Sequence, residues 1–177
     1  CTPVEPNLSR IFVFMKLSII IPTLNEEHYL PKLLLALAGQ TFKDFEVIVV
    51  DGSSEDKTLT AAENFKNQLP NLKIVTAPAR GTSVQRNFGA ALARGRFLLF
   101  LDADVLPAAD YLEHFLVLTE KKKTDVAVAW LIPESSRLID RLTSPLVNYL
   151  TLEISLKAAP VSTGANMFFR KDIFFNL

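Results

Sequence analysis

The chain has 177 residues, of which 49% are hydrophobic and 13 are phenylalanine. This length and composition predict one globular domain with a sizeable core and exclude a disordered chain. The 19 basic and 19 acidic residues give a formal net charge of zero, which argues against a broad nucleic-acid-binding surface, so we expect no nucleic-acid partner. The single cysteine excludes an internal disulfide, and with only two histidines the sequence offers no pattern of zinc ligands.

The first 14 residues differ from the rest of the chain. The apolar residues 11–14 are too few for a secretory signal, and Lys16 interrupts the run far below membrane-spanning length. We therefore predict residues 1–14 to be a disordered leader or upstream extension, with Met15 as a candidate natural start. Residues 15–177 form the predicted domain. The cysteine usage fits a reducing compartment, so we expect a cytoplasmic protein, with any membrane contact peripheral and at the cytoplasmic face.

Apolar runs and helical stripes alternate along this domain. The predicted strands cover residues 17–21, 46–50, 73–76, 97–101 and 126–130. The predicted helices end at Gly39, extend from about Asp56 to Leu69, and cover residues 83–94 and 111–119. This alternation with short loops predicts an α/β fold, in which a doubly wound, mostly parallel, Rossmann-like sheet forms the middle of three layers, with helices on both faces. Gly89 is expected to allow close packing of a helix on the sheet.

Beyond Pro133 the alternation stops. Residues 135–157 predict two helices broken near Pro145, with an apolar stripe along one side. We favour packing of this stripe against the sheet over contact with a membrane surface or a lipid-linked acceptor, because such stripes usually belong to the core.

Polar residues follow three of the predicted strands at the point where each strand ends. Thr23 and Glu26 follow the first, Asp51 the second, and Asp102 with Asp104 the fourth. Because the carboxyl ends of parallel strands meet at one edge of a sheet, these residues are expected to share one crevice. Two carboxylates two residues apart suit Mg²⁺ or Mn²⁺ bridging to a diphosphate. Alone, such a pair is more often a helix cap and a loop acid, and the three strand ends together favour the metal site.

Arg86 lies in the predicted helix 83–94. Its planar guanidinium can bind a phosphate or a base edge, and the amides at the start of the same helix can add donors for an anion. Without further context, it would be interpreted as a solvated helix arginine.

Several segments in a fixed order give the chain a family resemblance. They are residues 18–27 (SIIIPTLNEE), 40–42 (QTF), 46–58 (EVIVVDGSSEDKT), 86–89 (RNFG), 100–104 (FLDAD) and 164–170 (GANMFFR). With these segments the chain resembles the family 2 glycosyltransferases, which have the GT-A fold and bind a nucleotide-diphosphate sugar. The resemblance extends from about Lys16 to the end of the chain, and it implies a transferase of cell-envelope polysaccharide biosynthesis.

The resemblance also implies a role for each matching residue. Pro22, Thr23 and Glu26 would border the nucleobase and ribose, and Asp51 would hydrogen-bond the base. Arg86 would lie near the base or diphosphate, and Asp102 near the ribose or metal. Asp104 would be the principal ligand of Mg²⁺ or Mn²⁺. The acceptor side would be lined by Gly164, Ala165 and Asn166.

One expected segment does not occur. Such enzymes usually continue with a Glu-Asp pair whose aspartate is the general base of inverting transfer, and this sequence stops at Leu177 without it. We therefore name no catalytic residue, expect the base to lie beyond Leu177, and favour a C-terminally incomplete domain over an acceptor acidic enough to need no base, such as a lipid phosphate.

The predicted function is metal-dependent, inverting transfer of a sugar from a nucleotide-diphosphate sugar to a glycan, lipid or lipid-phosphate acceptor. Two alternatives stay open. The first is a catalytically incomplete fragment that only binds the nucleotide sugar. The second is a sugar nucleotidyltransferase, which is disfavoured because that class needs a Gly- and Arg-rich loop directly after the first strand, where this chain has Pro22-Thr23-Leu24-Asn25-Glu26.

Overall fold

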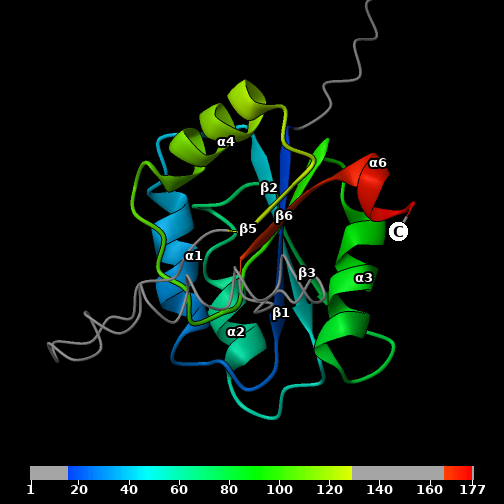
Figure 1. The fold of residues 1–177 in the computed structure, drawn as a ribbon. Coiled ribbons are helices and arrows are strands. Elements are labelled where there is room, and N and C mark those ends of the chain that lie inside the picture. Colours follow the sequence, from blue (N-terminus) through cyan, green and yellow to red (C-terminus); the bar gives the residue numbers. More distant parts are fainter. Residues whose placement is uncertain (1–15, 129–165, 177) are drawn as a thin grey trace, which may run out of the picture.

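The computed structural model describes residues 16–128 and 166–176. Within them a six-stranded sheet has the order β3-β2-β1-β4-β6-β5. Its strands are β1 (Leu17–Thr23), β2 (Phe45–Asp51), β3 (Leu72–Thr76), β4 (Phe97–Phe100), β5 (Val126–Val128) and β6 (Met167–Arg170). The helices are α1 (Leu30–Ala38), α2 (Thr58–Glu63), α3 (Thr82–Leu92), α4 (Tyr111–Lys122) and α6 (Lys171–Phe174). Figure 1 shows this arrangement.

The sheet is mostly parallel, as predicted. β1 pairs in parallel with β2 and β4, and β2 pairs in parallel with β3. β6 lies between β4 and β5 and is antiparallel to both. The connections from β1 through α1 to β2 and from β3 through α3 to β4 are the crossovers that a parallel sheet requires.

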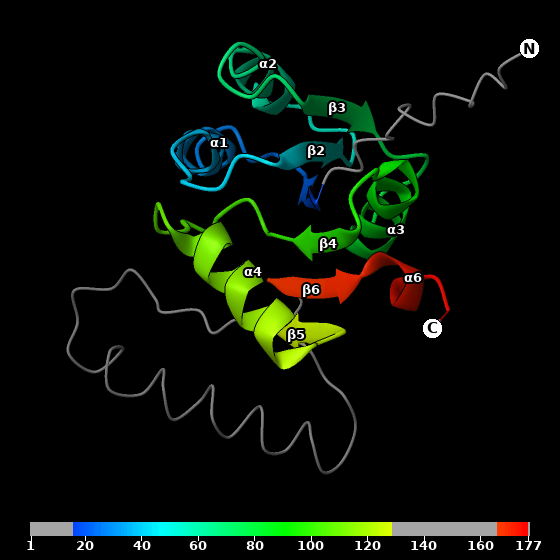
Figure 2. The same ribbon diagram turned by 90° about the horizontal axis from the view of Figure 1, so that it is seen from above.

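Helices cover both faces, which confirms the three-layer prediction. In Figure 2, α1, α2 and α4 lie on one side of the sheet, and α3 and α6 lie on the other. The residues of β1 alternate between the two cores: Ile19 and Ile21 pack with the leucines of α1, whereas Ile20 packs with Ala90 of α3. β1 and β2 are buried along their whole length. This explains the consecutive apolar residues 19–22 in β1 and 47–50 in β2.

Gly89 brings α3 into close contact with the sheet, as expected. A Cβ atom at this position would lie 2.5 Å from Cγ2 of Ile20 and 3.0 Å from Cγ2 of Val50. Only a residue without a side chain allows the helix to approach this closely.

Some element boundaries were predicted incorrectly. The helix expected to reach Leu69 ends at Glu63, and beyond it the amides of Phe65 and Lys66 bond to carbonyls three residues back, so the chain tightens into turns. α4 extends beyond the expected Thr119 and ends where Lys123 adopts a left-handed conformation with φ 51°.

Other predictions fall outside the described residues. These are the leader 1–14, the end of the strand predicted at 126–130, the two helices predicted over 135–157, and Gly164 and Ala165.

Candidate donor-binding site

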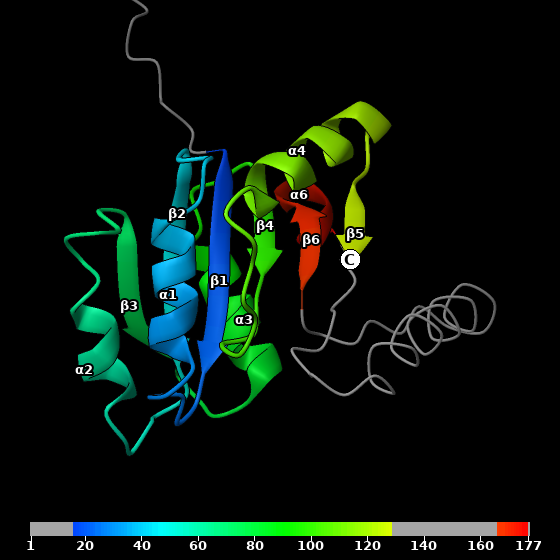
Figure 3. The same cartoon turned by 90° about the vertical axis from the view of Figure 1, so that its left-hand side faces the viewer.

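The carboxyl ends of β1, β2 and β4 meet at one edge of the sheet, as predicted (Figure 3). At this edge lies a hollow of about 300 Å³. Its lining contains five of the predicted site residues: Pro22, Thr23, Glu26, Asp102 and Asp104. Leu24, Gly81, Thr82, Gln85 and Ala103 complete it. The hollow therefore lies between the loop after β1, the start of α3 and the chain that follows β4.

Acidic side chains concentrate negative charge in the hollow. The pKa of Glu26 is raised from its ordinary value, first by burial and then by the charges of Asp104, Asp56 and Asp102. Asp104 is exposed and Asp102 is half-buried. This potential favours a cation, although the described residues contain no group of three or more histidine, cysteine, aspartate or glutamate side chains arranged to hold a metal. The pair could serve a cation that takes its remaining ligands from water or phosphate.

Arg86 is held by one of these acids. Its Nη2 donates to Oδ1 of Asp102 at 2.7 Å, with side-chain exposures of 16% and 33%. The Nε of Arg86 is buried without a hydrogen-bond partner. The sequence indicated both residues separately, and the structure joins them by this ion pair, from the second turn of α3 to the chain after β4. Arg86 itself is not among the residues that line the hollow.

Asp51 is buried at the end of β2, where it begins the loop that follows that strand. Its carboxylate accepts hydrogen bonds from the amides of Ser53 and Ser54 and from the hydroxyl of Ser54. These bonds shape the loop after β2, in which Ser53 has φ 70°. Asp51 does not line the hollow, and its contact with a nucleobase stays a prediction.

The loops after β1 and β2 are hydrogen-bonded to each other. The amide of Asn25 donates to Ser54 Oγ at 2.9 Å, and the amide of Glu55 donates to Asn25 Oδ1 at 2.8 Å. The amide of Glu26 donates to Thr58 Oγ1 at 2.7 Å. The two loop motifs, 22–27 and 51–58, therefore form one structural unit, which the sequence did not reveal.

Gln85 is a site residue that sequence reasoning missed. It is 4% exposed, and its Nε2 donates to the carbonyls of Thr23 and Val50, both at 2.7 Å. The available signal was its spacing: Gln85 lies one helical turn before Gly89, on the side of α3 that packs against the sheet.

Of the three predicted acceptor-side residues, Asn166 is the one that the structure describes. It precedes β6, has φ 102°, and is 3% exposed. Its Oδ1 accepts a hydrogen bond of 2.7 Å from the hydroxyl of Tyr111 on α4, and burial raises the pKa of that phenol to about 12. Asn166 thus anchors the start of β6, and its role toward an acceptor stays a prediction.

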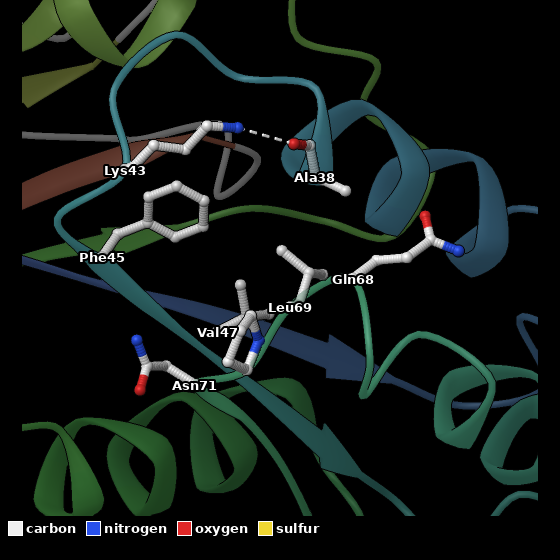
Figure 4. A pocket seen from close by; sticks show the side chains of 8 residues that line it. Ala38, Lys43, Phe45, Val47, Gln68, Leu69 and Asn71 are labelled. Carbon is white, nitrogen blue, oxygen red and sulfur yellow. Dashed lines mark hydrogen bonds between the residues drawn. The ribbon is translucent and has the colours of Figure 1, made fainter.

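A second pocket lies at the opposite, amino-terminal edge of the sheet (Figure 4). It has a volume of about 250 Å³ and is largely apolar, with Phe45, Val47 and Leu69 among its lining residues. The ammonium of Lys43 is bonded to the carbonyl of Ala38 at 2.8 Å. None of the predicted site residues lines it, so it is separate from the donor-site candidate.

Comparison with known proteins agrees with the geometry. Residues 18–176 match the sequence signature described as Glycosyl transferase family 2. The chain belongs to this family. Poly(ribitol-phosphate) beta-N-acetylglucosaminyltransferase TarS of Staphylococcus aureus (strain Mu50) is 32% identical over 170 residues, which is 91% of this chain and 30% of TarS. An uncharacterized glycosyltransferase of Haemophilus influenzae is 31% identical over 140 residues, covering 77% of this chain and 56% of that protein.

Solved structures show the same fold. The crystal structure of S. aureus TarS superposes with a TM-score of 0.72 at 28% identity, covering 92% of this chain and 29% of TarS. A shorter TarS, residues 1–349, was crystallised in complex with UDP, and its TM-score is 0.67. A mannosyltransferase from Pyrobaculum calidifontis, solved with GDP-Man and Mn²⁺, has a TM-score of 0.71 at 23% identity and supports the GT-A fold alone. The chain thus spans about a third to just over half the length of the curated relatives named above.

None of the helices within residues 16–128 and 166–176 combines the length and the hydropathy that a membrane crossing requires.

Proposed function

We propose that this chain carries the donor-binding half of a glycosyltransferase that moves a sugar from a nucleotide-diphosphate sugar to an acceptor. The observation that carries the proposal is the hollow at the carboxyl edge of the sheet, where Thr23, Glu26, Asp102 and Asp104 converge. This is where open α/β sheets bind nucleotides. Membership of glycosyl transferase family 2 supports the same reaction class.

Different residues would contact different parts of the donor. The paired loops after β1 and β2 would border the base and ribose, with Pro22 and Thr23 in the wall of the hollow and Asp51 setting the shape of the second loop. Arg86 holds Asp102 in one orientation and places a positive charge beside the acids. This charge would moderate the repulsion that a diphosphate meets there.

Asp104 and Asp102 fit a hard divalent cation, because carboxylate oxygens are the ligands that Mg²⁺ and Mn²⁺ prefer. The raised pKa of Glu26 reflects, after burial, the unbalanced negative charge that such a cation would offset. When bound, the ion would neutralise charge on the nucleoside diphosphate as it leaves.

The proposed acceptor is a glycan, lipid or lipid phosphate. The proposed transfer inverts the configuration at the anomeric carbon. The proposed location is the cytoplasm, with peripheral contact with the membrane. TarS, by its name, acts on poly(ribitol-phosphate), and a phosphate-rich acceptor of this kind is one member of the proposed class. Asn166, held by Tyr111, would lie on the acceptor side. A product of opposite anomeric configuration to the donor, observed by NMR, would support inversion.

Calorimetric titration of UDP and of GDP, each with Mn²⁺ and with a chelator, tests the donor site. We expect one nucleotide to bind with Mn²⁺ and only weakly in chelator, because the acids otherwise repel its phosphates. Radiolabelled donor with hydroxyl and lipid-phosphate acceptors then separates a complete enzyme from a fragment that only binds. Failure of both nucleotides to bind would overturn the proposal. Equal nucleotide affinity with Mn²⁺ and in chelator would show that donor binding does not depend on a metal.

A further inference from the structure

We propose that Gln85 is a positioning residue for the donor site, which it serves by holding the carboxyl ends of β1 and β2 at a fixed spacing. The inference rests on the proposed function, because it concerns how the same hollow is kept in a binding-competent shape. Gln85 lies on α3, whose first residue, Thr82, also lines the hollow.

The contacts are specific to a primary amide. The two hydrogens on Nε2 go to two different carbonyls, Thr23 at the end of β1 and Val50 near the end of β2, each at 2.7 Å. The Thr23 carbonyl also accepts the amide of Gly52 at 2.8 Å. These bonds join α3, the end of β1 and the start of the loop after β2 in one buried network.

Because Gly52 has no side chain, it leaves room for the side-chain amide of Gln85. A Cβ atom at Gly52 would lie 3.1 Å from Nε2 of Gln85, tighter than ordinary contact. The loop after β2 therefore passes directly over the glutamine side chain, and its position depends on where that amide lies. Loss of the amide would remove one hydrogen bond from each of two buried carbonyls and let the paired donor loops shift together.

A matched pair of variants separates positioning from stability. Gln85→Met keeps the side-chain length and removes both donors. Gln40→Met makes the same change in another buried glutamine, which bonds to the Ala108 carbonyl at 2.6 Å and to the amide of Leu112; none of these three residues lines the hollow. Both variants should unfold at a lower temperature than the native chain. Nucleoside diphosphate affinity is measured with Mn²⁺ well below either unfolding temperature.

We expect Gln85→Met to weaken UDP or GDP binding by about 10- to 100-fold, the range for residues that support a binding group, and Gln40→Met to leave it unchanged. The milder pair Gln85→Asn and Gln40→Asn, which shortens each side chain by one methylene, provides the same comparison where a methionine variant does not fold. The expected order of affinities is the same.

The outcomes distinguish failure of this inference from failure of the proposed function. Native affinity in the folded Gln85 variants, with a lowered unfolding temperature, would show a purely structural glutamine and overturn the inference alone. Equal losses of affinity in the Gln85 and Gln40 variants would also overturn it, because distance from the site would then not matter. Failure of the native chain to bind either nucleotide would instead overturn the proposed function, and this inference with it.

Discussion

Arg86 and Asp102 form an ion pair of 2.7 Å that joins α3 to the chain directly after β4. Asp102 therefore enters the hollow with one oxygen already engaged, whereas Asp104 is exposed. Two side chains that the sequence suggested as separate donor contacts act as one unit. Because the pair is partly shielded from solvent, its strength is less reduced by salt than that of a surface pair.

Removal of the Arg86 charge should weaken nucleotide binding. In Arg86→Met, the acids of the hollow lose their nearby positive charge, so we expect nucleoside diphosphate affinity in Mn²⁺ to fall by about tenfold or more, which corresponds to about 1.4 kcal/mol. Calorimetry provides the measurement. The control is Arg170→Met, which removes an arginine paired with Asp125 at the opposite edge of the sheet. If Arg86→Met and the control bind the nucleotide with the same affinity, Arg86 is an ordinary helix residue without a part in nucleotide binding.

The two acids should contribute unequally to metal-dependent binding. Asp104→Asn is expected to reduce the Mn²⁺-dependent part of nucleotide affinity more than Asp102→Asn, because Asp102 shares its charge with Arg86. Titrations with Mn²⁺ and in chelator give the metal-dependent part by difference. Asp110→Asn, at an exposed carboxylate before α4, serves as the control. Negligible effects of both hollow variants would make the pair a capping feature.

Glu46 should make stability depend on pH below about 4.5. Burial would raise the pKa of this fully buried carboxyl, but hydrogen bonds from the Arg94 amide, Ser18 Oγ and Lys73 outweigh burial and lower it from 4.5. A lowered pKa in the folded chain stabilises it above the unfolded value, and that contribution is lost as the pH falls through the folded pKa. Urea unfolding from pH 3 to 7 should show this loss.

Glu46→Gln should remove this dependence. At pH 7 the variant is expected to lose about 1.5–3 kcal/mol of unfolding free energy, as for hydrogen bonds to a charged group, and its difference from the native chain should shrink below pH 4.5. Glu120→Gln, in a surface pair with Lys16, is the control. A constant difference across the pH range would contradict the assignment to Glu46.

A side chain at position 89 should destabilise the folded chain. Gly89→Ala places a Cβ 2.5 Å from Ile20 Cγ2, so α3 must move away from the sheet, and we expect a loss of about 1–3 kcal/mol, as in overpacked cores. Gly39→Ala is the matched control, because its nearest neighbours would lie at the ordinary distances of 3.6 and 3.7 Å. Thermal unfolding compares the two, and equal unfolding temperatures would contradict the close packing of α3.

The candidate site could be predicted in outline because it follows strand ends. β1 and β2 are buried on both faces, so each contains a run of consecutive apolar residues, 19–22 in β1 and 47–50 in β2, and the polar residues that follow these runs stand out. β6 could not be predicted in the same way. Its four residues, Met167–Arg170, are too few to show a period, and its place between β4 and β5 depends on pairing with strands distant in the sequence.

The sequence by itself determined the α/β class, the edge of the sheet at which Thr23, Glu26, Asp102 and Asp104 gather, and the family. The class and the edge follow from local patterns of apolar and polar residues, and the family follows from the resemblance of its ordered motif segments. Only the tertiary structure decided the partners: Arg86 with Asp102, and Gln85 with the carbonyls of Thr23 and Val50. These partners are separated by 16 to 62 residues along the chain, and a hydrogen bond over such a separation depends on how helices and strands pack, which no local pattern records.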